Sequence, residues 1–333
     1  MIIKMEIKSV YVEILNKCNM HCCYCYNDSS KDNLPQINQE QFLDIVELMK
    51  KYECKNIWIS GGEPFLHPDI RNFMKICKDH CLNLGIATNG SYVTDFISDI
   101  CQFNPFLQIS LDSTDKYLNN KYRGEKAFEN AVQAIEVLNN SSYSGVISIK
   151  STLYSENSNI ESISAMIKFC ELNNISDVFF SPCLLQGRAE NKKFLINDHI
   201  LYGSPVESSC VRIHYMHSIY SCELLGDVVN TPLNLRITPT GDVFPCHHLP
   251  YAVFNCFEAV DDSAINQLLI NIKHNIQELL SRNTNCVSCI CKNECNGGCP
   301  ARRIYEEEYN DMICDEIRRD YVNKIKNLVD GVS

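Results

Sequence analysis

Three cysteines near the N-terminus have the type and spacing of ligands to an iron–sulfur cluster. Cys18, Cys22 and Cys25 follow one another at a C-x3-C-x2-C spacing, shortly after a strand-like run that ends at Leu15. Thiolates are soft ligands that suit iron, and a four-iron cluster normally takes four of them. Three thiolates from one loop therefore leave one iron open to another molecule. Zinc is the alternative, with His21 as the fourth ligand that a structural zinc site needs.

The C-terminal third contains a second and denser set of cysteines. Cys222 comes first, and a Gly-x4-Cys unit formed by Gly241 and Cys246 follows it. The set continues with a C-x2-C-x5-C-x3-C run and one separate cysteine, which are Cys286, Cys289, Cys295, Cys299 and Cys314. Such spacing is typical of metal centres. Both iron–sulfur clusters and a zinc ribbon are compatible with it.

Composition indicates the compartment and excludes several classes of protein. The 333 residues include 20 cysteines, and the N-terminus lacks the apolar core of a secretory signal. We therefore expect a cytoplasmic protein with reduced thiols rather than disulfides. The formal net charge of −11 opposes binding to the phosphates of nucleic acid. Without an apolar run of about 18 residues, no membrane span is expected.

The elements that must position the first cysteines follow a repeating β/α pattern. Six apolar runs are expected as strands: Val10–Leu15, Asn56–Ser60, Leu84–Thr88, Phe106–Leu111, Val146–Thr152 and Asp177–Ser181. Helical periodicity lies between them, for example at Phe42, Ile45, Val46 and Met49. Apolar strands that alternate with helices indicate an α/β fold with a parallel sheet. A partial (β/α)6 TIM-like barrel is our first interpretation and an open sheet the second, and both place functional groups after the strands.

The pattern divides the chain into three parts. Residues 1–190 are the predicted barrel. Residues 191–221 show no clear period and are expected to be a bridging segment. Residues 222–333 are predicted to form a small cysteine-rich α+β domain that binds clusters.

The N-terminal motifs together resemble the radical S-adenosylmethionine (radical SAM) superfamily. Cys18, Cys22 and Cys25, with Tyr24 just before the last cysteine, are similar to its signature. The stretch Ser60-Gly61-Gly62-Glu63-Pro64 follows the second expected strand, where that family has a Gly-Gly-Glu-Pro motif that contacts the amino group of the SAM methionine. Two glycines permit a close backbone approach, and a carboxylate or carbonyl receives an ammonium group.

Three later motifs resemble the parts of that family that line the SAM pocket. They are Thr88-Asn89-Gly90, Ser110-Leu111-Asp112 and Tyr122-Arg123-Gly124. Hydroxyls, a carboxylate and a guanidinium suit a zwitterionic, hydroxyl-bearing cofactor. A turn at Asn89-Gly90 and a helix cap at Asp112 are the structural alternatives. The resemblance implies SAM contacts from Asn89, Ser110, Asp112 and Arg123, and a backbone contact to adenine from Leu184 or Leu185.

The C-terminal cysteines resemble the seven-cysteine SPASM extension of radical SAM proteins, which carries two auxiliary four-iron four-sulfur clusters. The implied ligands are Cys222, Cys246 and Cys299 for the first cluster, and Cys286, Cys289, Cys295 and Cys314 for the second. A fourth ligand of the first cluster is missing. Cys210 is the nearest upstream candidate, Cys183 is the next, and a substrate thiolate is the third option. The gap between Cys222 and Gly241 is longer than the family usually shows.

The resemblance implies an enzyme with SAM and three four-iron four-sulfur clusters as cofactors. One electron would cleave SAM into methionine and a 5'-deoxyadenosyl radical, which abstracts a hydrogen from the substrate under anaerobic conditions. SPASM proteins mostly modify peptides or proteins, so the implied reaction is a thioether or carbon–carbon crosslink, or a related oxidation, in a ribosomally synthesised peptide.

Two other functions are compatible with parts of the sequence. Sulfatase-maturating enzymes, which generate formylglycine, usually have a basic Asp directly after the cysteine of the Gly-x4-Cys unit. Here that residue is His247, which is our candidate general base. A non-catalytic iron–sulfur or zinc scaffold is the alternative of another class. The Gly61–Pro64 loop argues against it, because a scaffold needs no ammonium site.

The expected partners follow from the same resemblance. The substrate is a peptide or protein, and an external one-electron donor such as flavodoxin or ferredoxin would supply the electron. Many peptide maturases begin with a leader-recognition domain. The first expected strand starts near residue 10, so we expect no such domain here and either a separate recognition protein or direct recognition. Nucleic acid and membranes are not expected partners.

Overall fold

One sheet organises the part of the chain that the computed structural model describes, which is residues 5–30, 35–183, 186–189, 206–215, 231–258 and 261–281, together with Cys289. Ten strands form this sheet in the order β10-β9-β8-β1-β2-β3-β4-β5-β6-β7. The order follows the sequence from β1 to β7, whereas the last three strands extend the other edge. This arrangement brings β1 to the interior of the sheet.

The strands and helices alternate along the first half of the chain. The strands are β1 (Ile7–Glu13), β2 (Asn56–Ser60), β3 (Asn83–Thr88), β4 (Phe106–Ser110), β5 (Ile147–Leu153), β6 (Asp177–Pro182), β7 (Arg212–Tyr215), β8 (Leu233–Ile237), β9 (Asp242–Phe244) and β10 (Phe254–Asn255). The helices are α1 (Gln39–Lys51), α2 (Ile70–Asp79), α3 (Ile97–Phe103), α4 (Lys116–Arg123), α5 (Ala127–Asn139), α6 (Ile160–Leu172) and α7 (Asp262–Ser281). Within the described residues, no helix has the length and apolar character needed to cross a bilayer.

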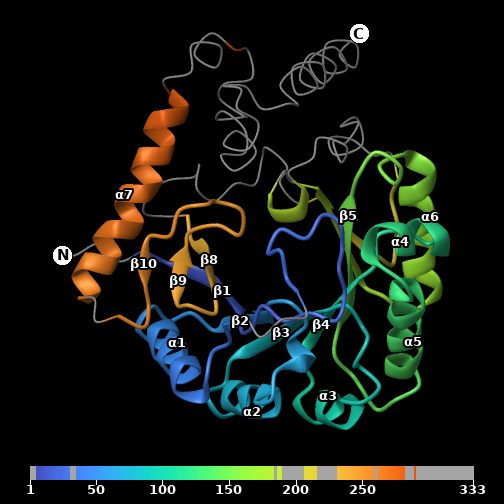
Figure 1. Ribbon diagram of the computed structural model, residues 1–333, viewed down its shortest axis with the longest axis horizontal. Helices are drawn as coiled ribbons and strands as arrows, with labels where there is room; N and C mark the ends of the chain where they lie inside the picture. Colours follow the sequence, from blue (N-terminus) through green and yellow to red (C-terminus); the bar gives the residue numbers. More distant parts are fainter. Residues whose placement is uncertain are drawn as a thin grey trace.

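The six strands expected from the sequence are confirmed as β1 to β6. Each pairs in parallel with the next, and helices α1 to α6 lie along the outside of the curved sheet (Figure 1). The fold is therefore α/β with a partial TIM-like barrel. The first strand ends at Glu13 rather than Leu15, because the chain turns there into the loop that contains the cysteines.

A seventh parallel strand was not expected from the sequence. β7 lies within residues 191–221, which we predicted to be a bridging segment, and it pairs with β6. The Asp177 carboxylate accepts two hydrogen bonds from the Arg212 guanidinium, at 2.8 and 2.7 Å, and lies 2.8 Å from His214 Nε2. Four residues are too few to show a strand period, so local pattern did not reveal this strand.

Strands β8 to β10 come from the predicted cysteine-rich segment, residues 222–333. β8 pairs in parallel with β1, with Leu235 opposite Val10 and Ile237 opposite Val12. β9 and β10 then extend this edge in antiparallel fashion. Residues on both sides of the predicted boundary near residue 222 therefore contribute strands to the same sheet.

The two faces of the sheet have different chemistry because alternate side chains point to opposite sides. The outer face carries a buried apolar row across neighbouring strands: Val12, Ile59, Ile86, Leu107 and Ile147. The inner face carries Tyr11, Trp58, Gly85 and Phe106 in register. A Cβ atom at Gly85 would lie 2.5 Å from the Trp58 ring, so the indole occupies the space that a larger residue would need. Aromatic rings thus fill this part of the inner face.

Candidate active site

The predicted cysteine loop starts directly after β1 and packs on the loop that follows β2. Gly62 N donates to Leu15 O at 2.8 Å, and Glu63 N donates to Lys17 O at 2.9 Å. A Cβ atom at Gly62 would lie 2.1 Å from Lys17 O, and Gly61 has a φ of +134°. Glycine is required for this approach. The sequence indicated that the two glycines make room for a ligand, but their observed neighbour is the backbone of the cysteine loop.

The three predicted cluster ligands are free thiols with limited access to solvent. Cys18 is buried, and Cys22 and Cys25 are half-buried. Burial, together with the nearby charges of Glu63, Cys22 and Cys25, raises the pKa of Cys18 to about 12. Burial also raises the pKa of Cys22. Thiols that resist ionisation become stable thiolates when a metal supplies positive charge.

The donor set of this loop fits an iron–sulfur cluster. Within the described ranges, no three His, Cys, Asp or Glu side chains surround a position for a single metal ion. A cubane cluster has a different requirement, because each thiolate binds a separate iron. Soft sulfur ligands on one loop, close enough to affect one another's ionisation, satisfy that requirement. Met20 N also donates to Cys18 Sγ at 3.4 Å.

Glu63 connects the end of β2 to the end of β3. Its fully buried carboxylate accepts hydrogen bonds from Thr88 Oγ1 at 2.8 Å, Asn89 N at 2.8 Å and Phe65 N at 3.3 Å. Burial outweighs these bonds and raises the pKa of Glu63 to about 7. The carboxylate also fixes Asn89, whose Nδ2 lies 3.9 Å from Cys18 Sγ. Two residues predicted to contact SAM are therefore held against the cysteine loop.

A buried ion pair holds the other side of the loop. Asp112 Oδ1 accepts from Arg123 Nη1 at 3.0 Å and from Thr152 N at 2.9 Å. The Tyr24 hydroxyl donates to Asp112 Oδ2 and accepts from Arg123 Nη1 at 2.8 Å. Arg123 Nε is buried and has no acceptor among the described residues. An acceptor on a bound ligand would satisfy it, so this orphaned donor fits a cofactor pocket.

For the remaining predicted SAM contacts within the described residues, the structure gives a position in the fold but no hydrogen bond to the cysteine loop. Ser110 is half-buried at the end of β4, on the inner face of the sheet. Pro64 is buried and starts a short 3-10 helix after the two glycines. Leu184 and Leu185 lie outside the described residues.

The predicted ligands of the auxiliary clusters are mostly outside the described residues, as is true of Cys222, Cys286, Cys295, Cys299 and Cys314. Cys246 is half-buried after β9, Cys289 is half-buried, and Cys210 is exposed before β7. Cys183 is buried in a cluster with Tyr24 and packs beside the first cysteine loop. The part of the chain that is described brings no three of these thiols together.

His247, the candidate base, lies against the inner face of the sheet. Its ring contacts that of Tyr11 edge-on, with centroids 4.2 Å apart. Burial, followed by the nearby cations Arg236 and Lys150, lowers the pKa of His247 to about 3. The imidazole is therefore neutral near pH 7 and a weak proton acceptor, which weighs against a general-base role.

A second buried ion pair was missed by the sequence analysis. Arg236 donates to both carboxylate oxygens of Glu13, at 2.8 and 3.2 Å. Tyr26 donates to Glu13 Oε1 at 3.0 Å, and Arg236 Nη1 donates to His247 O at 3.1 Å. The pair thus joins β1, β8, the cysteine loop and the turn after β9. The available signal was an acidic residue, Glu13, at the end of one apolar strand and a basic residue, Arg236, within another.

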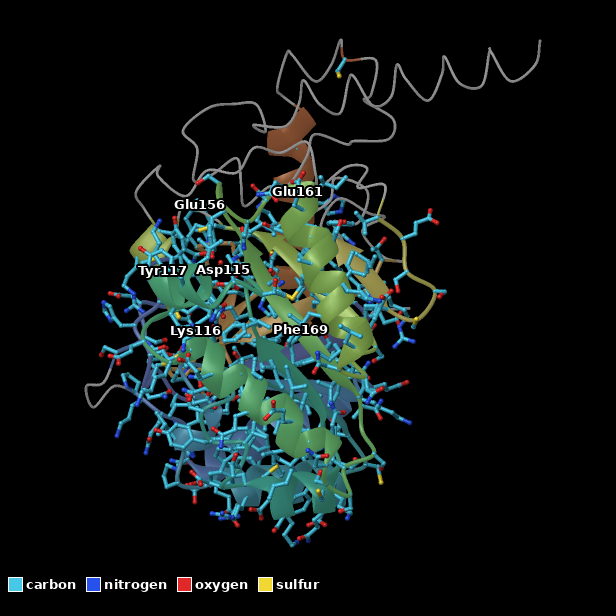
Figure 2. The ribbon with its side chains drawn as sticks, turned by 90° about the vertical axis from the view of Figure 1, so that its right-hand side faces the viewer. Asp115, Lys116, Tyr117, Glu156, Glu161 and Phe169 are labelled. Atoms are coloured by element: carbon cyan, nitrogen blue, oxygen red, sulfur yellow. The ribbon has the colours of Figure 1, made fainter. Side chains whose placement is uncertain are left out.

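A surface pocket of about 570 Å³ lies apart from these groups. Its lining consists of Asp115, Lys116, Tyr117, Asn120 and Lys121. Figure 2 shows the first three close together on the outer surface of the molecule. None of them was predicted as a site residue, and Tyr117 is 80% exposed. This pocket is a surface feature of α4 rather than part of the candidate active site.

A comparison with protein families finds a match that spans the site just described. Residues 12–170 match the family model of the radical SAM superfamily, and this span contains the cysteine loop, Glu63 and the Asp112–Arg123 pair. Residues 12–170 therefore form a radical SAM domain. Such a domain implies SAM and a four-iron four-sulfur cluster as cofactors.

Relatives of this radical SAM protein include mycofactocin maturases. It is 24% identical to MftC of Mycobacterium ulcerans over 322 residues. This match covers 88% of this chain and 83% of that protein. The match to MftC of Mycolicibacterium smegmatis is 27% identical over 133 residues, and it covers 39% of this chain and 34% of that relative. This second match therefore spans about a third of the relative's length.

Solved structures share the fold of this radical SAM protein. Streptococcus suis SuiB bound to S-adenosylmethionine has a TM-score of 0.70 and 17% identity, over 93% of this chain and 77% of SuiB. Native anSMEcpe with bound AdoMet and Cp18Cys peptide has a TM-score of 0.69 and 16% identity, over 98% of this chain and 99% of that one. At such identities the likeness shows a shared fold.

The first testable prediction concerns pH and Glu63. Burial raises the pKa of this carboxyl from 4.5 to about 7 in the folded chain. Between these values the folded state keeps a proton that the unfolded state has lost, so the free energy of unfolding should fall as pH rises. Glu63→Gln should flatten this slope in urea unfolding across the window, whereas Glu136→Gln, at an exposed position, should retain it. Equal slopes in all three proteins would contradict the assignment.

The second prediction concerns the buried ion pair. Arg123→Met leaves the Asp112 carboxylate buried without its cation, since the two side chains are 9% and 0% exposed. Loss of one partner of a buried pair costs about 3–5 kcal/mol of the free energy of unfolding. Lys116→Met is the matched control, because the ion pair between Lys116 and Glu129 is exposed. Urea unfolding should separate the two variants clearly, and similar losses in both would show that the pair does not hold the loop.

Proposed function

We propose that this radical SAM protein is an enzyme that uses SAM to modify a peptide or protein. The observation that carries this proposal is the fixed three-thiol loop after β1. Glu63 and Asn89 hold the loop on one side, and the Asp112–Arg123 pair holds Tyr24 on the other. Arg123 Nε, which is buried with no acceptor in the part of the chain that is described, supports a bound cofactor at this position.

Cys18, Cys22 and Cys25 would hold the cluster, and the surrounding polar groups would orient SAM. When bound, the cluster and SAM would supply one-electron reductive chemistry that generates a radical able to remove a hydrogen atom from the substrate. The residues proposed to contact SAM are Tyr24, Gly61, Gly62, Glu63, Pro64, Asn89, Ser110, Asp112, Arg123 and Leu184. In the protein their task is to bind and orient the cofactor.

The inner face of the sheet provides the space in which the substrate would react. Tyr11, Trp58 and Phe106 cover one part of this face with rings. Ser110 and Lys150 are register partners on the same face and present polar groups. Rings that exclude water on one side protect a reactive radical from side reactions. We retain His247 as a residue near the substrate, because it lies against Tyr11.

The finer proposal is a thioether or carbon–carbon crosslink, or a related oxidation, in a ribosomally synthesised peptide. It is supported by the mycofactocin maturases among the relatives and by the shared fold with SuiB, which has been solved bound to the precursor peptide SuiA. Formylglycine formation in a sulfatase is the second candidate. His247 disfavours it, since a carboxylate is the usual residue after the cysteine.

The C-terminal cysteines would bind two auxiliary clusters, with Cys210 as the candidate fourth ligand of the first. We further propose a cytoplasmic one-electron donor of the flavodoxin or ferredoxin type and, as one route of recognition, a separate protein that binds the leader of the peptide. Cys246 directly precedes His247 in the turn after β9. The His247 carbonyl accepts a hydrogen bond from Arg236. An auxiliary cluster at Cys246 would therefore lie beside the inner face.

The third prediction tests the cluster assignment. Replacing Cys18, Cys22 and Cys25 together with Ala should remove about one cluster in three, because three clusters are proposed and only one uses this loop. Incubation with dithionite and SAM should then yield no 5'-deoxyadenosine. Cys23→Ala is the matched control, since Cys23 lies in the same loop but outside the motif, and it should retain product formation and iron. Undiminished 5'-deoxyadenosine from the triple variant would refute the assignment.

The fourth prediction separates the auxiliary clusters from SAM cleavage. Cys289→Ser combined with Cys295→Ser should strip the second auxiliary cluster, and the variant should still form 5'-deoxyadenosine while modifying little peptide. The test substrate is a cysteine-containing precursor peptide chosen by inspecting the gene neighbourhood, and mass spectrometry measures its modification. Cys81→Ser, at an exposed position, should behave as wild type. Normal peptide modification by the double variant would make the auxiliary clusters structural only.

A further inference from the structure

A short segment far from the cysteine loop in sequence contacts it through one arginine. Arg188 belongs to the 3-10 helix Gly187–Ala189, which comes after β6. Its Nε donates to Cys22 O at 2.8 Å, and its Nη1 donates to Ser29 O at 2.8 Å. Its backbone N donates to Cys25 O at 3.0 Å. One residue therefore binds the carbonyl groups of two of the three proposed cluster ligands.

Gly187 makes this close contact possible. It has a φ of +60°, in the left-handed region. A Cβ atom at this position would lie 2.5 Å from both Cys25 O and Tyr26 O. Alanine would have to push the helix away from the loop, because the opposing atoms are backbone. The pair Gly187-Arg188 is thus shaped to fit the cysteine loop.

The Arg188 guanidinium also brings a positive charge to this loop. Its side chain is 14% exposed, so water screens its charge only partly. Nη1 contacts Asp28 Oδ1 at 3.0 Å, but the Asp28 side chain is 71% exposed. An exposed carboxylate in water neutralises a neighbouring cation weakly. Cys22, whose carbonyl binds Arg188, therefore lies beside a positive charge that Asp28 neutralises only weakly.

We propose that Arg188 is a positioning residue that fixes the spacing of Cys22 and Cys25 and raises the reduction potential of the cluster they hold. The proposal rests on the proposed function, because it takes these cysteines as cluster ligands. A cation beside a cluster stabilises the reduced form, which carries one more negative charge. Hydrogen bonding and charge near the cluster are established means of setting its potential. Arg188 would thus make the difficult one-electron reduction easier.

The experiment uses the full chain with reconstituted clusters and no peptide. The variants are Arg188→Gln, which removes the charge, and Arg188→Lys, which keeps the charge but loses the planar set of donors. Arg71→Gln is the matched control, because Arg71 makes a surface ion pair with Asp99. An electron paramagnetic resonance titration measures the reduced fraction of the cluster whose signal changes when SAM is added. Iron release to a chelator is followed separately.

Arg188→Gln should lower the reduced-to-oxidised ratio of this cluster by about tenfold at a fixed potential, which corresponds to about 59 mV for a one-electron couple. Arg188→Lys should keep the wild-type ratio but release iron from this cluster faster. Arg71→Gln should match the wild type in both measurements. Wild-type ratio and wild-type iron release in Arg188→Gln would overturn the proposal.

A further variant decides the positioning role if Arg188→Gln retains no cluster. Gly187→Ala keeps the arginine but moves it from the loop, so iron release should again be faster. Wild-type iron retention in both Gly187→Ala and Arg188→Lys would overturn that role, and an altered ratio in Arg188→Lys would overturn the role of charge. A wild-type chain without a SAM-responsive cluster would contradict the proposed function itself, so the two failures are distinguishable.

Discussion

The buried ion pair between Asp112 and Arg123 is the interaction on which the geometry of the site depends. Both charged side chains are buried, and burial of an unpaired charge is costly. Each is stable only while the Tyr24 hydroxyl, Thr152 N and the partner charge remain in place. Tyr24 stands between Cys22 and Cys25, so the requirement to satisfy the ion pair also fixes the thiols. An irregular loop thereby gains the rigidity of the barrel beneath it.

The two faces of the sheet divide stability and chemistry between them. The outer face buries rows of Val, Ile and Leu against helices, which supplies the hydrophobic contribution to folding. The inner face and the loops at the strand ends contain the charged groups of the buried ion pairs, including Glu13 and Arg236. Those groups are tolerated because each buried ion pair is also hydrogen-bonded to the cysteine loop or its neighbours. The site can therefore be polar without weakening the apolar core.

The periodicity and short motifs of the sequence predicted the elements that depend on neighbouring residues in the chain. The alternation of apolar runs predicted β1 to β6. The resemblance of the motifs around Tyr24, Asp112 and Arg123 to a known family pointed to residues that meet in the site. Strands β7 and β8 and the Glu13–Arg236 pair were missed, because each depends on a partner that is distant in the chain. The contact of Gly61 and Gly62 with the backbone of the cysteine loop was not predicted either, since only the folded chain brings that backbone near. Local patterns predicted secondary structure and candidate site residues. They could not predict contacts between segments that are distant in the chain.

The parallel pairing of β8 with β1 has a consequence for how the protein forms on the ribosome. Glu13 and its partner Arg236 are separated by 223 residues. At roughly 5–20 residues per second, translation leaves this edge of β1 unpaired for roughly 10–45 s after the first strand is made. During that interval the cysteine loop lacks the Glu13–Arg236 contacts that reach Tyr26 and Asn27. Metal that binds after synthesis is complete would therefore bind a loop with all of these contacts. Metal that binds earlier would bind a loop without the contacts of Tyr26 and Asn27 to the Glu13–Arg236 pair.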